Sequence, residues 1–271
     1  MKAPAFDYAR PTTLEEALTL RAAGGDDAKF LAGGQSLGPL LNLRLARPSL
    51  LIDVRRLPEL AGWSIEGDWV RIGAAVTHAA IEDGVLPGPL GRFLASVAHG
   101  IGYRAIRNRG TLGGSLAHAD PAADWVSVMA LLAAEVDVRS ASRARRVAAA
   151  DLVDGPLSTV LDPDELIVSV RVPRGSDSAR WSYRKFNRKP GKFAEAIGGF
   201  HIDPERGACR AVVGATDAGP RVIAEASALL VSDRACEAAA ADAGFAPGTY
   251  EHQIHAVMLR RARQAISEAV A

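Results

Sequence analysis

The sequence predicts an α+β protein with two domains. Short apolar runs of strand length alternate with longer segments whose apolar residues recur at helical spacing, and the last segment, 234–271, is an alanine-rich helical tail. Turn residues at 173–177 interrupt this pattern and mark the predicted domain boundary. A chain of 271 residues with 48% hydrophobic content is long enough to bury a core in each domain.

The first elements are predicted to be a helix, a strand and a second helix. Thr13 caps the first helix, Glu16 reaches back to the cap, and the pair Gly24-Gly25 ends the helix. The apolar run 29–32 then leads through a glycine turn into the leucine-rich segment 37–45, which is predicted to be helical. The glycine turn therefore connects a strand to a helix.

The remaining elements follow from the spacing of apolar residues between turn residues. We expect helices at 89–99 and 124–134, and strands at 50–54, 69–76, 135–138, 165–172, 180–186, 194–202 and 210–215. The second domain is thus predicted to combine a sheet with helices.

Composition argues against several classes of function. The 32 basic and 31 acidic residues give a net charge of +1 without a charged block, which disfavours nucleic acid or a membrane surface as a partner. No apolar run approaches the roughly 20 residues that span a bilayer, and the first residues lack the pattern of a secretory signal, so we expect a cytoplasmic protein. Cys209 and Cys236 are too few for an iron–sulfur cluster, so a metal-based redox centre is expected on another chain.

Two glycine-rich loops are the main candidates for a binding site. Loop 1, around Gly33-Gly34-Gln35-Ser36, offers consecutive backbone N–H groups before a predicted helix, and such a loop suits phosphate oxygens. Loop 2, Gly110 to Ser115, repeats the idea and adds two hydroxyls. Each loop by itself is compatible with an ordinary tight turn, but two such loops favour a pyrophosphate. Neither matches the Rossmann or P-loop pattern, which argues against those folds.

Polar residues around loop 2 allow more than one interpretation. His118, Asp120 and Asp124 could bind sugar hydroxyls or a metal ion, while the alternative is an exposed turn in which Asp124 caps the next helix. The nearby arginines could neutralise phosphate charge or simply be solvated; they are Arg104, Arg107 and Arg109.

Two segments carry a resemblance to a known family: AGGQSLGPLLNLRLARPSLLIDV at 32–54 and IRNRGTLGGSLAHADPAADW at 106–125. With them the chain resembles the flavin-binding medium subunit of molybdenum hydroxylases, a group that includes carbon monoxide, xanthine, nicotine and caffeine dehydrogenases. The resemblance runs from Phe6 through the second domain. It implies a p-cresol methylhydroxylase-like FAD fold in residues 1–175, with subdomains of about 1–55 and 56–175. A C-terminal domain of three strands and a helical bundle would follow at 176–271.

The resemblance also implies which residues hold FAD. One side of the pyrophosphate would be lined by Ala32, Gly33, Gly34, Gln35, Ser36 and Leu37, and the other by Gly110, Thr111, Gly113, Gly114 and Ser115. Ile101 and Gly102 would lie near the flavin ring, and Asp124 would bond cofactor hydroxyls, with His118 and Asp120 as its neighbours.

In the strand region of 164–193 the resemblance implies three further contacts. Ile167 matches an apolar cofactor contact, either Lys185 or Arg184 matches a basic residue near the flavin ring, and Phe193 matches an aromatic beside it. A cation there would stabilise reduced anionic flavin. The chain departs from relatives at 99–104, where many have a His-Pro segment, and at Lys192, where an acidic residue is frequent.

By this resemblance the chain is a relay that needs no catalytic residue and no metal of its own. Molybdopterin on a large subunit would oxidise the substrate, two 2Fe–2S clusters on a small subunit would pass the electrons to FAD here, and the complex would be a dimer of heterotrimers. The substrate and the final acceptor, which could be NAD, oxygen, a quinone or a cytochrome, stay open.

Three other functions compete with this relay. The first is a stand-alone flavin oxidoreductase, for which His78, His99 or His118 would transfer protons. The second is an assembly subunit that has lost its cofactor. The third is a metal-dependent enzyme that uses the polar residues after loop 2.

Overall fold

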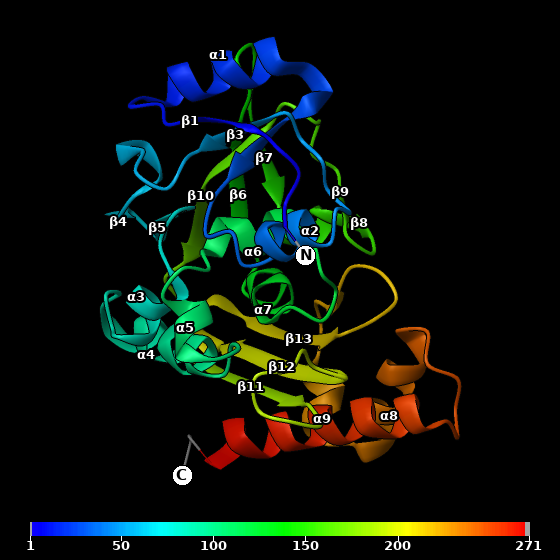
Figure 1. The fold of residues 1–271 in the computed structure, drawn as a ribbon. Coiled ribbons are helices and arrows are strands. Elements are labelled where there is room, and N and C mark those ends of the chain that lie inside the picture. Colours follow the sequence, from blue (N-terminus) through cyan, green and yellow to red (C-terminus); the bar gives the residue numbers. More distant parts are fainter. Residues whose placement is uncertain (1, 269–271) are drawn as a thin grey trace.

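The computed structural model describes residues 2–268, which form sheets of three, five and four strands and a short two-stranded hairpin (Figure 1). Helices lie between and around the sheets, and one large hydrophobic core underlies the first two sheets. A second core lies in the last sheet and its helices. The mixture of helices and sheets agrees with the predicted α+β class.

The first sheet is parallel and carries loop 1 at the end of a strand. Its order is β1-β3-β2, with β1 at Asp7–Ala9, β2 at Ala28–Leu31 and β3 at Leu50–Asp53. Helix α1, Leu14–Gly24, begins at the predicted cap, where the Thr13 hydroxyl accepts from the Glu16 N–H. The Glu16 carboxylate, however, accepts from the N–H of Thr12 and not from that of Thr13.

Helix α2 is shorter than its leucine-rich sequence predicts. It spans Leu37–Asn42, and the expected helix through residue 45 is wrong because Arg44 adopts a left-handed conformation with φ of 59°. The N–H of Leu45 then bonds to the carbonyl of Leu40 and closes the turn. No glycine marks this turn, so no local signal in the sequence predicts it.

The second sheet is antiparallel, with the order β4-β5-β10-β6-β7. Its strands are β4 (Trp63–Glu66), β5 (Trp69–Gly73), β6 (Glu135–Arg139), β7 (Ala144–Ala148) and β10 (Leu166–Pro173), and the hairpin comprises β8 (Val153–Gly155) and β9 (Ser158–Thr159). Five helices connect β5 to β6: α3 (His78–Glu82), α4 (Gly88–His99), α5 (Arg104–Arg107), α6 (Leu112–His118) and α7 (Asp124–Leu131). This helical connection contains loop 2 and most of the predicted site.

The last sheet has four strands and not the three that were expected. It is antiparallel, with β11 (Arg180–Phe186), β12 (Ala196–Asp203), β13 (Ala208–Gly214) and β14 (Arg221–Ile223). Strand β14 escaped prediction because three residues are too few to show alternation. The helical tail is two helices, α8 (Asp233–Asp242) and α9 (Tyr250–Glu268), separated at Gly244 and Gly248; its end at 269–271 lies outside the described residues.

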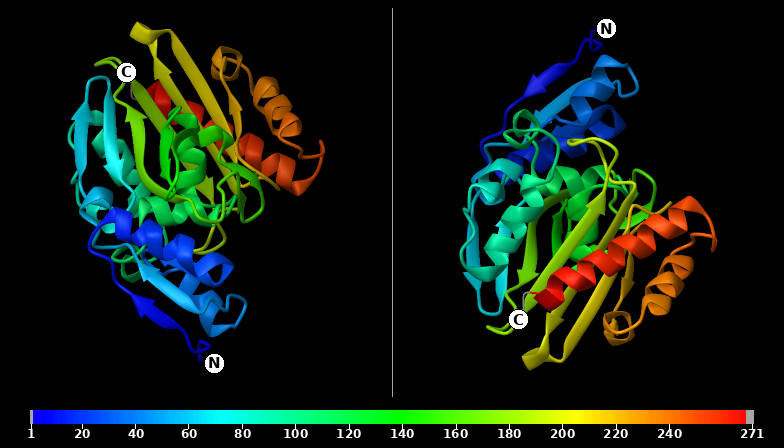
Figure 2. Two further views of the ribbon diagram at one scale, coloured as in Figure 1. Left: turned by 90° about the horizontal axis from the view of Figure 1, so that it is seen from above. Right: turned by 90° about the horizontal axis from the view of Figure 1, so that it is seen from below.

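Helix α7 lies between the two larger sheets (Figure 1). Glycines on the last sheet allow the close approach: a Cβ on Gly214 would lie 2.0 Å from the Ser127 hydroxyl oxygen of α7. Helix α9 covers the opposite face of the sheet (Figure 2), where a Cβ on Gly198 would lie 2.6 Å from the N atom of Leu259. Residues at the start of α7 can therefore meet side chains from β11.

Candidate functional site

The two glycine loops touch through their backbones. A Cβ built on Gly33 would lie 2.1 Å from the carbonyl oxygen of Arg109 and 2.8 Å from the Cα of Gly110. A Cβ on Gly114 would lie 3.5 Å from the Cβ of Ala32. Residues almost 80 positions apart in the sequence thus form one surface, and Gly33 is required for this approach.

Loop 1 has free backbone donors. Among residues 2–268, no backbone or side-chain acceptor takes the N–H groups of Gly33, Gly34, Gln35, Ser36 and Leu37. Gly34 has a φ of 73°, which a glycine adopts without strain. Consecutive backbone N–H groups without internal partners are able to bind an anion.

Loop 2 uses most of its N–H groups internally, contrary to the idea that it repeats loop 1. Leu112 donates to the carbonyl of Val76 and Gly113 to that of Ala74, at 3.0 and 2.9 Å. The Gly114 N–H donates to the Thr111 hydroxyl oxygen at 3.1 Å, as a helix cap. The N–H of Thr111 has no acceptor within the described residues. Loop 2 can thus offer the Thr111 N–H and the hydroxyl hydrogens.

Asp124 at the start of α7 and Lys185 on β11 form an ion pair. The Lys185 Nζ donates to the two carboxylate oxygens at 2.8 and 3.0 Å, and the pair is mostly buried. The Tyr183 hydroxyl also donates to Asp124, and burial, followed by the Asp124 charge, raises the pKa of Tyr183. Lys185 donates further to the carbonyl of Gly100 at 2.8 Å. Three parts of the fold meet at this pair: the start of α7, β11 and the residue that follows α4.

These contacts correct one interpretation of Asp124 and decide the register of β11. Asp124 is the first residue of α7 and does not cap it, because the cap position is Ala123 and no side chain bonds there. Lys185, rather than Arg184, points toward α7, since side chains alternate along a strand. Arg184 is exposed, and its guanidinium donates to the carbonyl of Tyr183.

Other predicted residues are more scattered. Ile101 and Gly102 are half-buried at the end of α4, whereas Phe193 is 58% exposed in the loop before β12. Ile167 is buried in the first core. His118 ends α6, and Asp120 accepts from the N–H of Ala122 without meeting Asp124.

The three flanking arginines differ in what they contact. Arg107 is only 7% exposed and holds both carboxylate oxygens of Glu82, so it is neither solvated nor free for phosphate. Arg104 binds Glu82 and Asp83. Arg109 is exposed, as the solvated interpretation expects, and its carbonyl oxygen lies against Gly33 of loop 1. Arg104 and Arg107 are therefore used to hold helices together.

His78 was a candidate proton donor and instead supports loop 2. Its Nδ1 accepts from the Trp125 indole N–H at 3.0 Å, and its backbone N–H donates to the Gly110 carbonyl at 2.9 Å. Burial, followed by the Arg107 charge, lowers the pKa of His78 to about 4. His78 is thus a neutral, buried residue whose Nδ1 is occupied by Trp125. Trp125 and Tyr183 complete these contacts, and neither was named as a site residue from the sequence.

No group of three His, Cys, Asp or Glu side chains in residues 2–268 is arranged to hold a metal ion. The metal-dependent interpretation of Asp124 is also wrong, because a lysine occupies its carboxylate. Among the described helices, none is long and apolar enough to cross a membrane.

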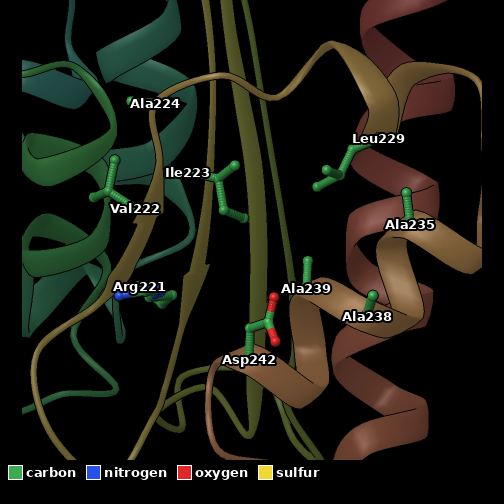
Figure 3. A pocket seen from close by; sticks show the side chains of 9 residues that line it. All are labelled: Arg221, Val222, Ile223, Ala224, Leu229, Ala235, Ala238, Ala239 and Asp242. Carbon is green, nitrogen blue, oxygen red and sulfur yellow. The ribbon is translucent and has the colours of Figure 1, made fainter.

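A pocket of about 450 Å³ lies between β14 and α8 (Figure 3), and its residues are distant in sequence from the glycine loops. Apart from Arg221 and Asp242, apolar side chains line it (Figure 3), and it contains no residue of the predicted site. The backbone contact between loops 1 and 2 is therefore a better guide to the cofactor site than this pocket.

Comparisons with known proteins identify the family. Residues 4–175 match the model described as the FAD binding domain in molybdopterin dehydrogenase. The 6-hydroxypseudooxynicotine dehydrogenase complex subunit alpha of Paenarthrobacter nicotinovorans is 42% identical over 73% of this chain and 67% of that protein. The carbon monoxide dehydrogenase medium chain of Afipia carboxidovorans is 35% identical over 95% of both chains.

Solved structures agree with this relationship. Carbon monoxide dehydrogenase from Hydrogenophaga pseudoflava matches with a TM-score of 0.88 and 31% identity over 99% of both chains. Quinoline 2-oxidoreductase from Pseudomonas putida matches with a TM-score of 0.87 and 30% identity, also over 99% of both. These matches confirm the expected FAD-binding fold and the oxidoreductase class. The chain belongs to the family of FAD-binding subunits of molybdopterin dehydrogenases.

Proposed function

We propose that this chain receives electrons from iron–sulfur clusters of a partner subunit and passes them to an external acceptor. Bound FAD supplies the redox chemistry. The chain itself has to hold the cofactor between its two glycine loops and the Lys185–Asp124 pair, with an edge open to each electron partner. The organic substrate would then be oxidised on another subunit.

The contact between the two loops is the observation that carries the proposal. It brings Gly33 against Arg109 and Gly110, so that the free N–H groups of residues 33–37 and of Thr111 lie on adjoining loops, which supports a pyrophosphate site there. Charge-assisted hydrogen bonds from such fixed donors are short and strong. The full set of FAD contacts that we propose is the one named from the resemblance, with Lys185 in place of Arg184.

The histidines favour a relay over a stand-alone flavin enzyme. His78 is buried and occupied by Trp125, and His99 is exposed and paired with Glu82 at 2.9 Å. Neither is placed at the loop contact as a free general base. His118 is the one candidate left from the original three.

The partners in this proposal are a large molybdenum subunit and a small iron–sulfur subunit, in a dimer of heterotrimers. Relatives named medium chain and medium subunit support a place in such a complex. A cytoplasmic location and a domain boundary near residue 175 also belong to the proposal. The separate hydrophobic cores before and after that boundary support it.

The test is to purify the native protein gently with its copurifying chains and to record visible spectra during reduction by substrate. Flavin and iron–sulfur bands that bleach together, on three kinds of subunit, are expected. Flavin on a lone chain that turns over a small molecule would support the stand-alone enzyme, and a colourless protein that cannot be reconstituted with FAD would refute the proposal.

A further inference from the structure

The turn between α4 and α5 has its carbonyl groups fixed by two cations. Lys185 donates to the carbonyl of Gly100, and the Arg107 Nη1 donates to those of Ile101 and Gly102, at 2.8, 3.0 and 3.1 Å. Gly102 has a φ of 51°. The N–H groups of Gly102 and Tyr103 have no acceptor in residues 2–268. With three successive carbonyls held, the turn has one defined orientation.

Helix α3 anchors this arrangement at both of its ends. Its last residue, Glu82, accepts from the Arg107 Nε and Nη2 at 2.7 and 2.9 Å, and Arg107 holds the pKa of Glu82 down at about 2. The backbone N–H of its first residue, His78, donates to the carbonyl of Gly110 in loop 2. Arg107 lies only two residues before Arg109, whose carbonyl meets Gly33. The turn and the two glycine loops are therefore linked through one short helix.

We propose that Arg107 is a positioning residue: anchored on Glu82, it fixes the Ile101–Gly102 turn so that the turn's free N–H groups face bound FAD. The inference rests on the proposed function, because it assumes that this turn lines the cofactor site beside Lys185. A planar guanidinium can serve both carboxylate oxygens and both carbonyls at once. A lysine ammonium keeps the charge but cannot match that geometry.

The chain provides matched controls for the test. Arg104 binds Glu82 at 2.7 Å as Arg107 does, yet it contacts none of the turn's carbonyls. Asp83 is adjacent to Glu82, carries the same charge and is bound by Arg104. Arg107→Lys should therefore be compared with Arg104→Lys, and Glu82→Gln with Asp83→Asn.

The measurement is the midpoint potential and the visible spectrum of flavin in the FAD-loaded complex, with thermal unfolding alongside. Arg107→Lys is expected to change the ratio of oxidised to reduced flavin at a fixed potential about tenfold, which is about 30 mV for a two-electron couple, and to shift the flavin bands. Arg104→Lys should do neither. Glu82→Gln should change the potential and bands more than Asp83→Asn, although both remove the same charge.

An unchanged potential and spectrum in Arg107→Lys, with lower thermal stability only, would overturn the inference by assigning Arg107 a purely structural role. Equal shifts in Arg104→Lys would overturn it by pointing to charge alone. If Arg107→Lys does not fold, the Glu82→Gln and Asp83→Asn pair decides: a larger flavin shift in Glu82→Gln supports positioning, and equal shifts refute it. A wild-type protein without flavin would instead refute the proposed function.

Discussion

Replacing Gly33 by alanine should separate the two glycine loops and weaken FAD binding. The added Cβ would lie 2.1 Å from the Arg109 carbonyl oxygen, and ordinary contact begins at 3.4 Å. The loops must therefore part by about 1.3 Å. A hydrogen bond of about 2.9 Å between an N–H group and a phosphate oxygen would then stretch beyond bonding distance.

The loss can be estimated from the donors on the two loops. Each hydrogen bond to a charged group contributes about 1.5–3 kcal/mol, so losing two would weaken FAD binding by about 3 kcal/mol or more, which is at least a hundredfold. Gly38→Ala is the matched control. Gly38 lies in α2, the helix that follows loop 1, and a Cβ there would meet nothing within 4 Å.

The assay is titration of the apoprotein with FAD, followed by flavin fluorescence, with circular dichroism as a check of folding. We expect Gly38→Ala to bind as the wild type does. Affinity within threefold of wild type in folded Gly33→Ala, or an equal loss in Gly38→Ala, would refute the reasoning about the loop contact.

Three further results are expected. Lys185→Met should weaken FAD at least tenfold in the same titration, while Arg184→Met, one residue away on the exposed side of β11, should not; equal effects would contradict the assigned register. Asp124→Asn should lower the free energy of unfolding, measured with urea, by about 3 kcal/mol, because it leaves the mostly buried Lys185 without its counter-charge. A decrease below about 1 kcal/mol, the size expected of an exposed ion pair, would disprove this. His78 has its pKa lowered from 6.5 to about 4, so its contribution to stability is complete above pH 6.5 and is lost as the pH falls through 4. Between pH 6.5 and 4, the free energy of unfolding of His78→Gln should therefore fall by about 3 kcal/mol less than that of the wild type. Urea titrations in which the variant and the wild type show the same pH dependence would reject this.

Local signals in the sequence predicted most of the elements. Thr13 and Gly24 bound α1, the strand at 180–186 is β11, and the glycine turn after β2 is where the free N–H groups lie. These features depend on residues within one turn or strand, so the chain's local chemistry is sufficient to identify them. Helix α2 shows the limit, because its end at Arg44 carries no glycine.

The sequence by itself determined that two glycine loops exist and that Asp124 and a cation near residue 185 are candidates. Only the tertiary structure decided how they are used. Side chains alternate along a strand, so choosing Lys185 over Arg184 required knowing which face of β11 meets α7. Likewise, the roles of Asp124 and Arg107 depend on partners more than 20 residues away, and no local pattern encodes such contacts.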